Sequence, residues 1–577
     1  MRTYGRLMLA RDQSSWRLDA DPHVHMRAKR IFGKLASSAL HLDLSNTPET
    51  CRELAWFMDL YPLDMTDADR AVLLARAAAH VQNIARLRDL IDPNYIPPPV
   101  DLALPLRTYQ ERSVRLYLGS GSLLCGDDVG LGKTAVGIGS FTDPRTLPAI
   151  VVTLAHLPKQ WEAQIRKFAP DLSVHRIKKG TPYALPTFMG KGPDVLIINY
   201  HKLVGWAKVL GAYGKSLVFD EIQELRHDGT ARYEAAEHLC EAIAFKLGLS
   251  ATPIYNYGGE IFNIFNLLKP GCLGTRREFS LEWCHYAGLG EKARLTDPRA
   301  FGTWARDNFL MIRHTRQDAG REIPPVLTVP YRIDADTEAL DAIKGDAAEL
   351  ARLILSTAAA PTDRWRAAGQ LDVLVRQATG IAKAPFAAAF VRMLLEQTDD
   401  NEKIVLYGWH REVYDIWLQE LREFNPRLYT GSETATQKDA AKEAFVSGDC
   451  RVLIISLRAG AGLDGLQAAS SCVVFGELDW SPGVHEQCIG RVARDGQEKN
   501  VAAYYLISDS GSDPAMVEVL GLKKEQAEGI RNPQADGLER LEVDVNRVKT
   551  LAESYLRQNA RKRGMTVITT DAEEVSV

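Results

Sequence analysis

The sequence predicts an α/β protein built from two parallel-sheet lobes, and three observations support that fold class. The chain has 577 residues, which at roughly 150 residues per domain is room for three or four domains. Hydrophobic residues make up 46% and charged residues 25%, as in globular proteins with large cores. Short apolar runs separated by helix-like or Gly/Pro-rich sequence occur in two series, as expected for strands buried beneath helices. The predicted strands are 149–154, 195–200, 217–219 and 247–249 in the first series, and 404–407, 452–456, 472–475 and 502–507 in the second.

The segments around these strands complete the predicted domain order. Residues 1 to about 95 look mainly helical, because Thr66 and Asp69 form a capping box ahead of the helical spacing of 71–91. Ile96-Pro97-Pro98-Pro99 reads as a stiff linker, and a strand at 326–333 is expected to complete the first sheet. The predicted domains are a mainly helical accessory domain (1–100), lobe one (101–333, with a helical insertion at about 254–325), a helical linker (334–380), lobe two (381–510) and a helical C-terminal extension (511–577).

A glycine-rich segment, Cys125 to Thr134, follows the apolar pair Leu123-Leu124 and precedes a helix-like stretch. Glycines let backbone N–H groups wrap phosphates, Lys133 can reach the β and γ oxygens, and Thr134 offers a hydroxyl to Mg²⁺. The strict GxxxxGK[ST] pattern fails because Asp127 stands where its first glycine belongs. The segment predicts a nucleotide site, with a plain glycine-rich turn as the alternative.

Two further segments fit phosphoryl chemistry. Leu217 to Gln223 is an apolar strand ending in Asp220 and Glu221, where one carboxylate can hold Mg²⁺ and its neighbour can polarise the attacking water. Alone, such a pair is more often a helix N-cap. Arg491 and Arg494 lie three residues apart on one predicted helix face, where both could reach a γ-phosphate. The alternative for them is an ordinary solvated basic face.

Taken in order, these motifs and several others resemble one family. Residues from about 104 to 508 are similar to the Swi/Snf-type group of superfamily-two helicase-like ATPases. The matching segments are Leu106-Arg107-Thr108-Tyr109-Gln110 (adenine recognition), Asp127 to Thr134 (the DEMGLGKT loop), Ile150 to Phe168 with Gln160-Trp161 (first contact with the nucleic-acid backbone), Ser250-Ala251-Thr252-Pro253 (coupling), Arg313-His314-Thr315-Arg316, Ile323-Pro324-Pro325, Tyr429 to Ser432, Ser456 to Leu466 and Asp479 to Pro482.

The resemblance implies RecA-like lobes, ATP and Mg²⁺ as cofactors, and DNA as partner. It implies nucleotide contacts from Arg107, Gln110, Asp128, Gly130, Leu131, Gly132, Lys133 and Thr134, with Thr134 and Asp220 holding the metal. It implies catalysis by Lys133, Asp220, Glu221, Arg491 and Arg494. It implies coupling and nucleic-acid contacts from Ser250, Thr252, Lys159, Trp409, His410, Ser456, Arg458 and Gln487. Trp409 and Trp480 are interpreted as buried or lobe-coupling aromatics in preference to base-stacking platforms.

Within the group, Val473 to Val484 and Tyr407 to His410 look most like the strand-annealing, fork-remodelling branch and its bacterial and phage relatives. Three positions depart from the family pattern. DEIQ replaces DEAH at 220–223, Ala493-Arg494-Asp495 replaces His-Arg-Ile, and Gly465 stands where many members keep Asn.

The function predicted from this reading is an ATP-driven translocase on duplex or forked DNA. The alternatives are an ATP-regulated DNA clamp, the motor subunit of a nuclease or restriction system, and, more weakly, an RNA helicase. The clamp predicts a damaged hydrolysis set, yet Lys133, Thr134, Asp220, Glu221 and both arginines are present. A nuclease would need a separate partner, because no E-x-K follows Pro193-Asp194.

The remaining sequence features concern the cellular location of the protein, the state of its thiols and its charge. No signal-peptide core or run of 18 apolar residues occurs, and the eight cysteines include no CxxC pair. We therefore expect a monomeric, cytoplasmic or nucleoid-associated protein with reduced thiols and no membrane partner. The formal net charge of -4 gives no hint of a DNA partner, but the positive charges are concentrated in a few segments of the chain. Residues 156–192 hold 7 Lys or Arg against 2 acids, and 1–34 and 547–563 are similarly basic.

Overall fold

The computed structural model describes residues 2–32, 41–251, 259–284, 293, 295–316, 318–320, 326–356, 360–397, 402–458, 463–494 and 496–517. The chain forms two compact units, Met1–Pro98 and Pro99–Val577. Of the sequence-predicted features, Thr252, Pro253, Ile323-Pro324-Pro325, Asp495 and almost all of the C-terminal extension lie outside the described residues.

Unit 1 packs three helices on a small antiparallel sheet of order β1-β2-β3. The Thr66 hydroxyl accepts a hydrogen bond from the Asp69 N–H (3.1 Å), so the predicted cap starts the longest helix of the unit. The sheet was not anticipated, although its strands alternate buried and exposed residues with period two. Its elements are β1 (Gly5–Leu9), β2 (Ser15–Ala20), α1 (Pro22–Ile31), β3 (Leu42–Ser45), α2 (Pro48–Leu60) and α3 (Asp67–Ile91).

Lobe one, the first part of unit 2, is a seven-stranded parallel sheet of order β10-β4-β9-β8-β5-β7-β6. Its central strands are fully buried apolar runs, as expected for a sheet covered by helices. The strands are β4 (Ser122–Cys125), β5 (Ala149–Thr153), β6 (Val174–Arg176), β7 (Val195–Asn199), β8 (Ser216–Asp220), β9 (Phe245–Leu249) and β10 (Met311–Ile312). The helices are α4 (Thr108–Ser120), α5 (Lys133–Gly139), α6 (Pro158–Phe168), α7 (Tyr200–Tyr213), α8 (Ala231–Ala242), α9 (Glu260–Leu268), α10 (Arg276–Trp283) and α11 (Pro298–Asp307).

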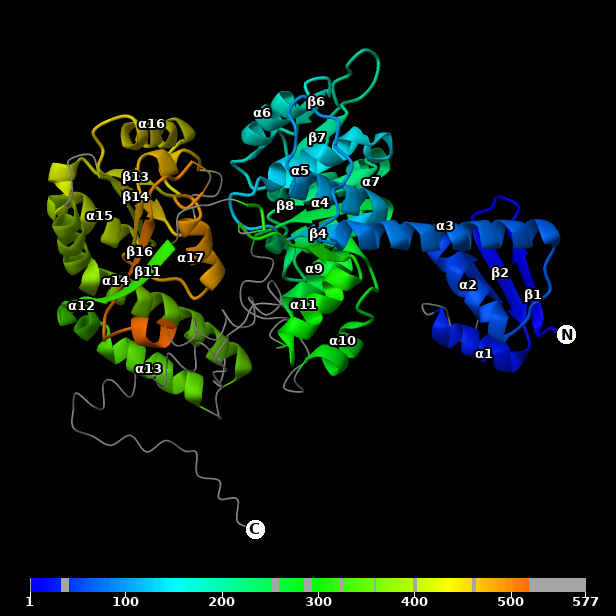
Figure 1. Ribbon diagram of the computed structural model, residues 1–577. Helices are drawn as coiled ribbons and strands as arrows, with labels where there is room; N and C mark the ends of the chain where they lie inside the picture. Colours follow the sequence, from blue (N-terminus) through cyan, green and yellow to red (C-terminus); the bar gives the residue numbers. More distant parts are fainter. Residues whose placement is uncertain are drawn as a thin grey trace, which may run out of the picture. The chain divides into compact units, whose positions relative to one another are not determined.

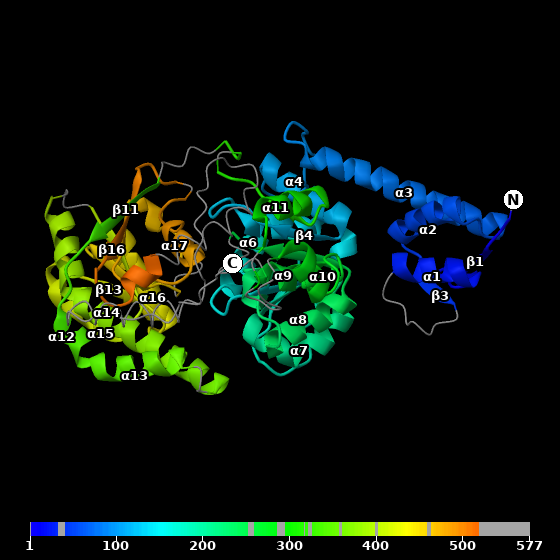
Figure 2. The same ribbon diagram turned by 90° about the horizontal axis from the view of Figure 1, so that it is seen from below.

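Lobe two is a six-stranded parallel sheet of order β11-β16-β15-β12-β14-β13. Alternate residues of its strands enter separate hydrophobic cores, so helices cover both faces (Figures 1 and 2). The strands are β11 (Val326–Arg332), β12 (Ile404–Gly408), β13 (Arg427–Tyr429), β14 (Val452–Ser456), β15 (Cys472–Phe475) and β16 (Val501–Ile507). The helices are α12 (Thr337–Ala342), α13 (Lys344–Leu355), α14 (Pro361–Gln397), α15 (Arg411–Glu420), α16 (Ala435–Val446) and α17 (Pro482–Ile489).

The strand β11 corrects one prediction. It pairs in parallel with β16 and therefore belongs to the second sheet, not the first as expected. The edge of the first sheet beside β4 is already filled by β10, and a largely exposed edge strand carries no local signal of the sheet that it joins. The lobe boundary predicted at 333 thus falls before residue 326.

Helix α14 also changes the predicted boundary near 380, because it runs unbroken from the helical linker into lobe two. By length and composition it could cross a membrane, but most of its apolar stretch is buried in the lobe, as in a core helix. The Lys383 ammonium donates to the Asp513 carboxylate (2.7 Å), and both side chains are almost fully buried. This ion pair ties α14 to the segment after β16.

Candidate nucleotide site

The glycine-rich segment forms a loop between β4 and α5, at the edge where the parallel strands of lobe one end. Gly130 and Gly132 have φ of 88° and 74°, a region that favours glycine. The Lys133 ammonium donates to the carbonyl oxygens of Asp127 (2.7 Å) and Asp128 (3.1 Å), so it folds over the loop. The loop therefore has the build of a phosphate cradle.

Side chains from the segment after β10 hold this loop in place. The fully buried Asp127 carboxylate accepts hydrogen bonds from the His314 backbone N–H and ring Nδ1, both at 2.8 Å. Arg313 pairs with the Asp128 carboxylate at 2.5 Å, and the Arg316 guanidinium donates to the Val129 carbonyl. The residue that breaks the strict glycine pattern, Asp127, is thus an anchor for the loop.

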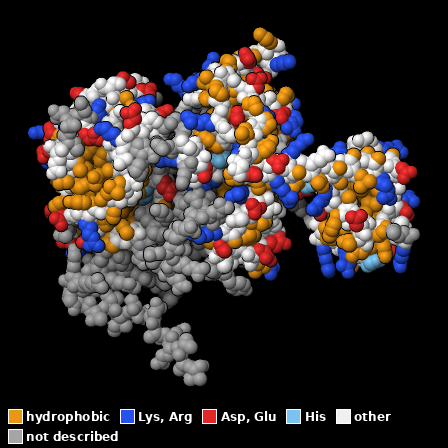
Figure 3. All heavy atoms as spheres, viewed as in Figure 1, with side chains coloured by type: hydrophobic (Ala, Val, Ile, Leu, Met, Phe, Trp, Pro, Cys, Tyr) orange, Lys and Arg blue, Asp and Glu red, His pale blue; other side chains and the backbone are white. Residues whose placement is uncertain are grey.

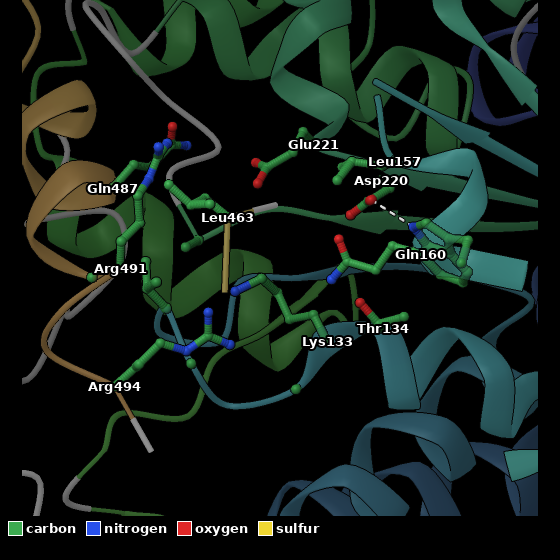
Figure 4. A pocket seen from close by; sticks show the side chains of 16 residues that line it. Lys133, Thr134, Leu157, Gln160, Asp220, Glu221, Leu463, Gln487, Arg491 and Arg494 are labelled. Carbon is green, nitrogen blue, oxygen red and sulfur yellow. Dashed lines mark hydrogen bonds between the residues drawn. The ribbon is translucent and has the colours of Figure 1, made fainter. Parts of the chain in front are cut away.

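Asp220 and Glu221 stand at the tip of β8, facing the loop (Figure 4). The Asp220 carboxylate accepts hydrogen bonds from the Trp161 indole N–H (2.7 Å) and the Thr153 hydroxyl (3.0 Å). Glu221 has φ of 58°, an uncommon conformation for a residue with a side chain, and the Gln223 amide donates to its carboxylate at 2.5 Å. Strand β5 and helix α6 therefore fix the Asp220 carboxylate, and the turn just after β8 fixes that of Glu221.

The two carboxyl groups have raised pKa values. Burial raises the pKa of Asp220, against the lowering effect of the Trp161 and Thr153 hydrogen bonds. Burial also raises the pKa of Glu221, and the adjacent Asp220 charge raises it further. A cation between them would favour the charged forms of both groups.

Gln487 on helix α17 of lobe two, and Arg491 and Arg494 just after it, line the other side of the same pocket (Figure 4). The predicted shared helix face is wrong, because α17 ends at Ile489 and both arginines lie in the turn that follows. The Arg491 side chain is 7% exposed, and its buried Nη1 has no hydrogen-bond partner among the described residues. Arg494 is partly exposed and pairs with Asp464 at 3.1 Å. Two cationic groups from lobe two thus face the lysine of lobe one.

The two lobes also touch beside these arginines. A Cβ atom built on Gly490 of lobe two would lie 2.4 Å from Cγ1 of Val129 in the lobe-one loop. The absence of a side chain at 490 is therefore what lets Val129 pack against the end of α17.

The predicted adenine-recognition residues lie behind the loop. The Gln110 amide and the Tyr109 hydroxyl both donate to the Leu131 carbonyl, each at 2.9 Å. The Gln110 side-chain oxygen accepts a hydrogen bond from the Arg107 N–H (3.0 Å). These residues position the turn before Lys133, and Gln110 is largely buried.

The predicted coupling and nucleic-acid residues fall into separate places. Trp409, His410, Ser456 and Arg458 lie at the ends of β12 and β14, where Arg458 stacks over the Trp409 ring and pairs with Asp479 at 2.9 Å. The Glu477 carboxylate accepts from the His410 ring (2.6 Å) and its N–H. Trp409 is 39% exposed, whereas Trp480 is buried, and its indole N–H donates to Asp372 (2.7 Å).

Three other members of that set lie in lobe one or in the pocket itself. Lys159 is exposed on α6, and buried Ser250 donates its backbone N–H to the Cys125 carbonyl at 3.1 Å. Gln487, expected to contact nucleic acid, lines the nucleotide pocket.

Sequence reasoning missed several pocket residues. Trp161 belongs to the segment expected to touch the nucleic-acid backbone, but its side chain is buried and its indole N–H donates to Asp220. Thr153, which also bonds Asp220, was not singled out, and neither was the pocket-lining role of Leu157 and Leu463. The only available signal was position, because Thr153 lies near the end of the strand predicted at 149–154, which pairs with β8.

Comparison with known proteins gives two family matches. Residues 50–331 match the SNF2-related domain, and residues 387–496 match the helicase conserved C-terminal domain. A mouse protein, DNA annealing helicase and endonuclease ZRANB3, is 25% identical over 465 residues, which are 77% of this chain and 42% of that protein. The uncharacterized ATP-dependent helicase YqhH of Bacillus subtilis is 25% identical over 509 residues, 82% of this chain and 87% of that protein.

Among solved structures, the Sulfolobus solfataricus SWI2/SNF2 ATPase core in complex with dsDNA is 20% identical and aligns with a TM-score of 0.37. The alignment covers 76% of this chain and 96% of that one. The chain spans about two fifths of the length of the first curated relatives that it matches.

Proposed function

Because the chain belongs to the SNF2-related family of helicase-like ATPases, we propose that it is an ATP-hydrolysing motor that moves along duplex or forked DNA and remodels or anneals its strands. The observation that carries this proposal is the pocket that joins the lobes. Lys133 and Glu221 from lobe one and Arg491 from lobe two line one cavity, which a motor that closes its lobes on ATP requires.

The donor set of the pocket fits Mg²⁺ and a nucleoside triphosphate. The Thr134 hydroxyl and the Asp220 carboxylate are hard oxygen ligands of the kind that Mg²⁺ prefers. Lys133 and the loop N–H groups suit the β and γ phosphates, and the unpartnered Arg491 Nη1 suits an anion. Bound Mg²⁺ would neutralise phosphate charge.

Each residue of the pocket then has a role in hydrolysis. Glu221 orients and polarises the attacking water, since it stands beside Asp220 at the strand tip. Arg491 and Arg494 stabilise the charge that develops on the transferred phosphoryl group. Because these arginines belong to lobe two, hydrolysis is completed only when the lobes close, and this couples chemistry to lobe movement.

DNA contacts are proposed for the exposed Lys159 and for the Trp409–Arg458 pair at the end of β12 and β14. Backbone contacts of this kind bind without sequence preference. Because lobe two adds little local positive charge, we propose that many of its phosphate contacts come from N–H and hydroxyl groups, Ser456 included. The relatives in Bacillus and Mycoplasma support a bacterial-type protein that works on DNA in the cytoplasm.

The test is ATP hydrolysis by the full chain with no nucleic acid, single-stranded DNA, duplex DNA, forked DNA and RNA. We expect duplex and forked DNA to stimulate turnover. Stimulation by RNA or single strands alone would refute the duplex motor and favour the RNA-helicase alternative. Lys133→Ala should abolish turnover and leave the thermal unfolding profile intact, whereas wild-type turnover in that variant would refute the site.

The rival function is an ATP-regulated clamp, and a second assay, displacement of a triplex-forming strand, addresses it. Hydrolysis that DNA stimulates, but without displacement of a triplex-forming strand from duplex DNA, would favour a clamp over a translocase. We expect displacement by the wild-type chain and none by the Lys133→Ala variant.

A further inference from the structure

The loop between β6 and β7, together with α7, carries charge of nearly one sign. Residues 172–219 contain a single acid, Asp194, whose carboxylate accepts hydrogen bonds from the Ser173 N–H (2.8 Å) and hydroxyl (2.6 Å). The same stretch holds Arg176, Lys178, Lys179, Lys191, Lys202, Lys208 and Lys215. Arg176 pairs with Glu162 of α6, but in a chain with a net charge of -4 the remaining lysines make a local anion-attracting surface.

The loop is tied down along α7. The Lys178 N–H donates to the Tyr183 hydroxyl (3.1 Å), and the Trp206 indole N–H donates to the Lys179 carbonyl (3.0 Å). At the far end, the Tyr213 hydroxyl donates to the Pro193 carbonyl (2.6 Å). The backbone is thus fixed at several points while Lys178, Lys179 and Lys191 stay exposed.

The end of this loop, residues 188–191, is a tight turn with an apolar tip. Phe188 and Lys191 exchange two backbone hydrogen bonds, and the residues between them, Met189 and Gly190, have φ of 49° and 79°. Two positive φ angles define a turn that favours Asn-Gly, so a methionine there is unfavourable. Met189 is 103% exposed and Phe188 is 41% exposed. The tip therefore displays two apolar side chains where a polar residue would be more stable.

The loop projects from lobe one beside β6 (Figure 1), and hydrophobic side chains with Lys or Arg beside them gather at its end (Figure 3). Lysines bind phosphates, while apolar side chains at a narrow tip can wedge between bases or pack on unstacked ones. An anionic membrane is the less suitable ligand, because two tip side chains bury little area compared with an amphipathic helix.

We propose that residues 178–191 form a second DNA contact, distinct from the motor track, in which Lys178, Lys179 and Lys191 hold the phosphates of a duplex arm and Phe188 and Met189 pack against bases exposed at a fork. This inference rests on the proposed function, since it assumes a DNA motor. In this proposal, the loop makes the protein bind forked DNA more tightly than uninterrupted duplex DNA.

The tip is tested with the double variant Phe188→Ser, Met189→Asn in the full chain. Asn suits the turn better than Met, so the loop keeps its shape and loses only its apolar side chains. Fluorescence anisotropy should show fork affinity lowered about ten-fold, as for the loss of a base-stacking contact. Duplex affinity and duplex-stimulated ATP hydrolysis should stay within two-fold of wild type. Leu281→Asn, at a residue 57% exposed on α10, is the matched control and should change neither.

The lysines are tested with the triple variant Lys178→Gln, Lys179→Gln, Lys191→Gln. Its slope of log affinity against log salt should be shallower by about 3, because each lost phosphate contact removes roughly 0.9. An unchanged slope, or fork and duplex affinities that fall equally in the tip variant, would overturn the proposal. So would binding of the wild type to phosphatidylserine vesicles that the tip variant loses while its fork affinity is unchanged.

These outcomes are separable from failure of the proposed function. A wild-type chain whose ATP hydrolysis responds to no DNA refutes the motor and the loop contact together. A wild-type chain stimulated by duplex DNA, with a tip variant that binds forks as well as wild type, refutes the loop contact alone.

Discussion

The contact between Gly490 and Val129 makes a sharp prediction about how the lobes communicate. In Gly490→Ala, the added Cβ would lie 2.4 Å from Val129 Cγ1 and 2.8 Å from its Cβ, both closer than real atoms approach. Such overpacking costs roughly 1–3 kcal/mol. Most of this cost arises only when the loop and α17 are together, because the contact within lobe two, with the Glu486 carbonyl oxygen at 3.2 Å, is much milder. If the catalytic state needs that contact, turnover should fall roughly 5- to 150-fold.

Folding should respond in the opposite direction. Gly490 has φ of -63°, ordinary helical backbone that alanine prefers, so the substitution should stabilise the fold by about 0.4–1 kcal/mol. We therefore expect slower ATP turnover together with an unchanged or higher unfolding temperature. A variant that simply misfolds would lose both.

A second substitution at Val129 should restore turnover to the Gly490→Ala variant, and a smaller side chain should restore more of it. Val129→Ala removes the nearest atom but keeps the Cβ at 2.8 Å, so it should restore part of the turnover lost in Gly490→Ala, and Val129→Gly should restore more. The assay is steady-state ATP hydrolysis with saturating DNA for both single and double variants. If Gly490→Ala costs the same turnover whichever residue stands at 129, the contact does not carry the coupling, and the reasoning fails.

Three other predictions concern single side chains of the site. Trp161→Phe removes the indole N–H from the Asp220 carboxylate, so Mg²⁺ should activate hydrolysis with about ten-fold weaker affinity in a metal titration. Trp206→Phe is the control and should not weaken that affinity, because its buried indole bonds the Lys179 carbonyl and neither residue lines the pocket. Arg491→Ala should lower turnover far more than ATP affinity. Its loss of turnover should also exceed that of Arg494→Ala, because Arg491 is the more buried of the two. If ATP affinity falls as much as turnover, both arginines are structural. Burial raises the pKa of Asp127, but the His314 ring and the Lys133 ammonium outweigh it, so the pKa lies below the ordinary 3.8. A carboxyl group with a depressed pKa stabilises the fold above about pH 3.8, and this stabilisation is lost as the pH falls through the pKa of the folded state. Asp127→Asn should therefore lower the free energy of unfolding by about 3 kcal/mol at pH 7. In urea unfolding, the difference from wild type should shrink below about pH 4. A difference that stays constant to pH 3 would contradict the charge assignment.

The parallel strands and the phosphate loop could be predicted because their signals are local. A buried strand such as Val452–Ser456 is a continuous apolar run, and Lys133 and Thr134 follow their glycines directly. Contacts set by tertiary packing could not be predicted in this way. Trp161 and Asp220 are 59 residues apart, and they meet only because the C-terminal ends of β5 and β8 are neighbours.

Asp127 shows how one such contact explains an apparent defect in the motif. In the strict loop pattern a glycine at this position gives the backbone freedom to turn. Here the turn is fixed instead by a buried carboxylate, which accepts from His314 because β10 runs beside β4. Two residues later, Val129 faces lobe two at Gly490. The loop is therefore held firmly on the lobe-one side and touches the end of α17 on the other. Because Gly490 directly precedes Arg491, this contact connects the phosphate loop to that arginine.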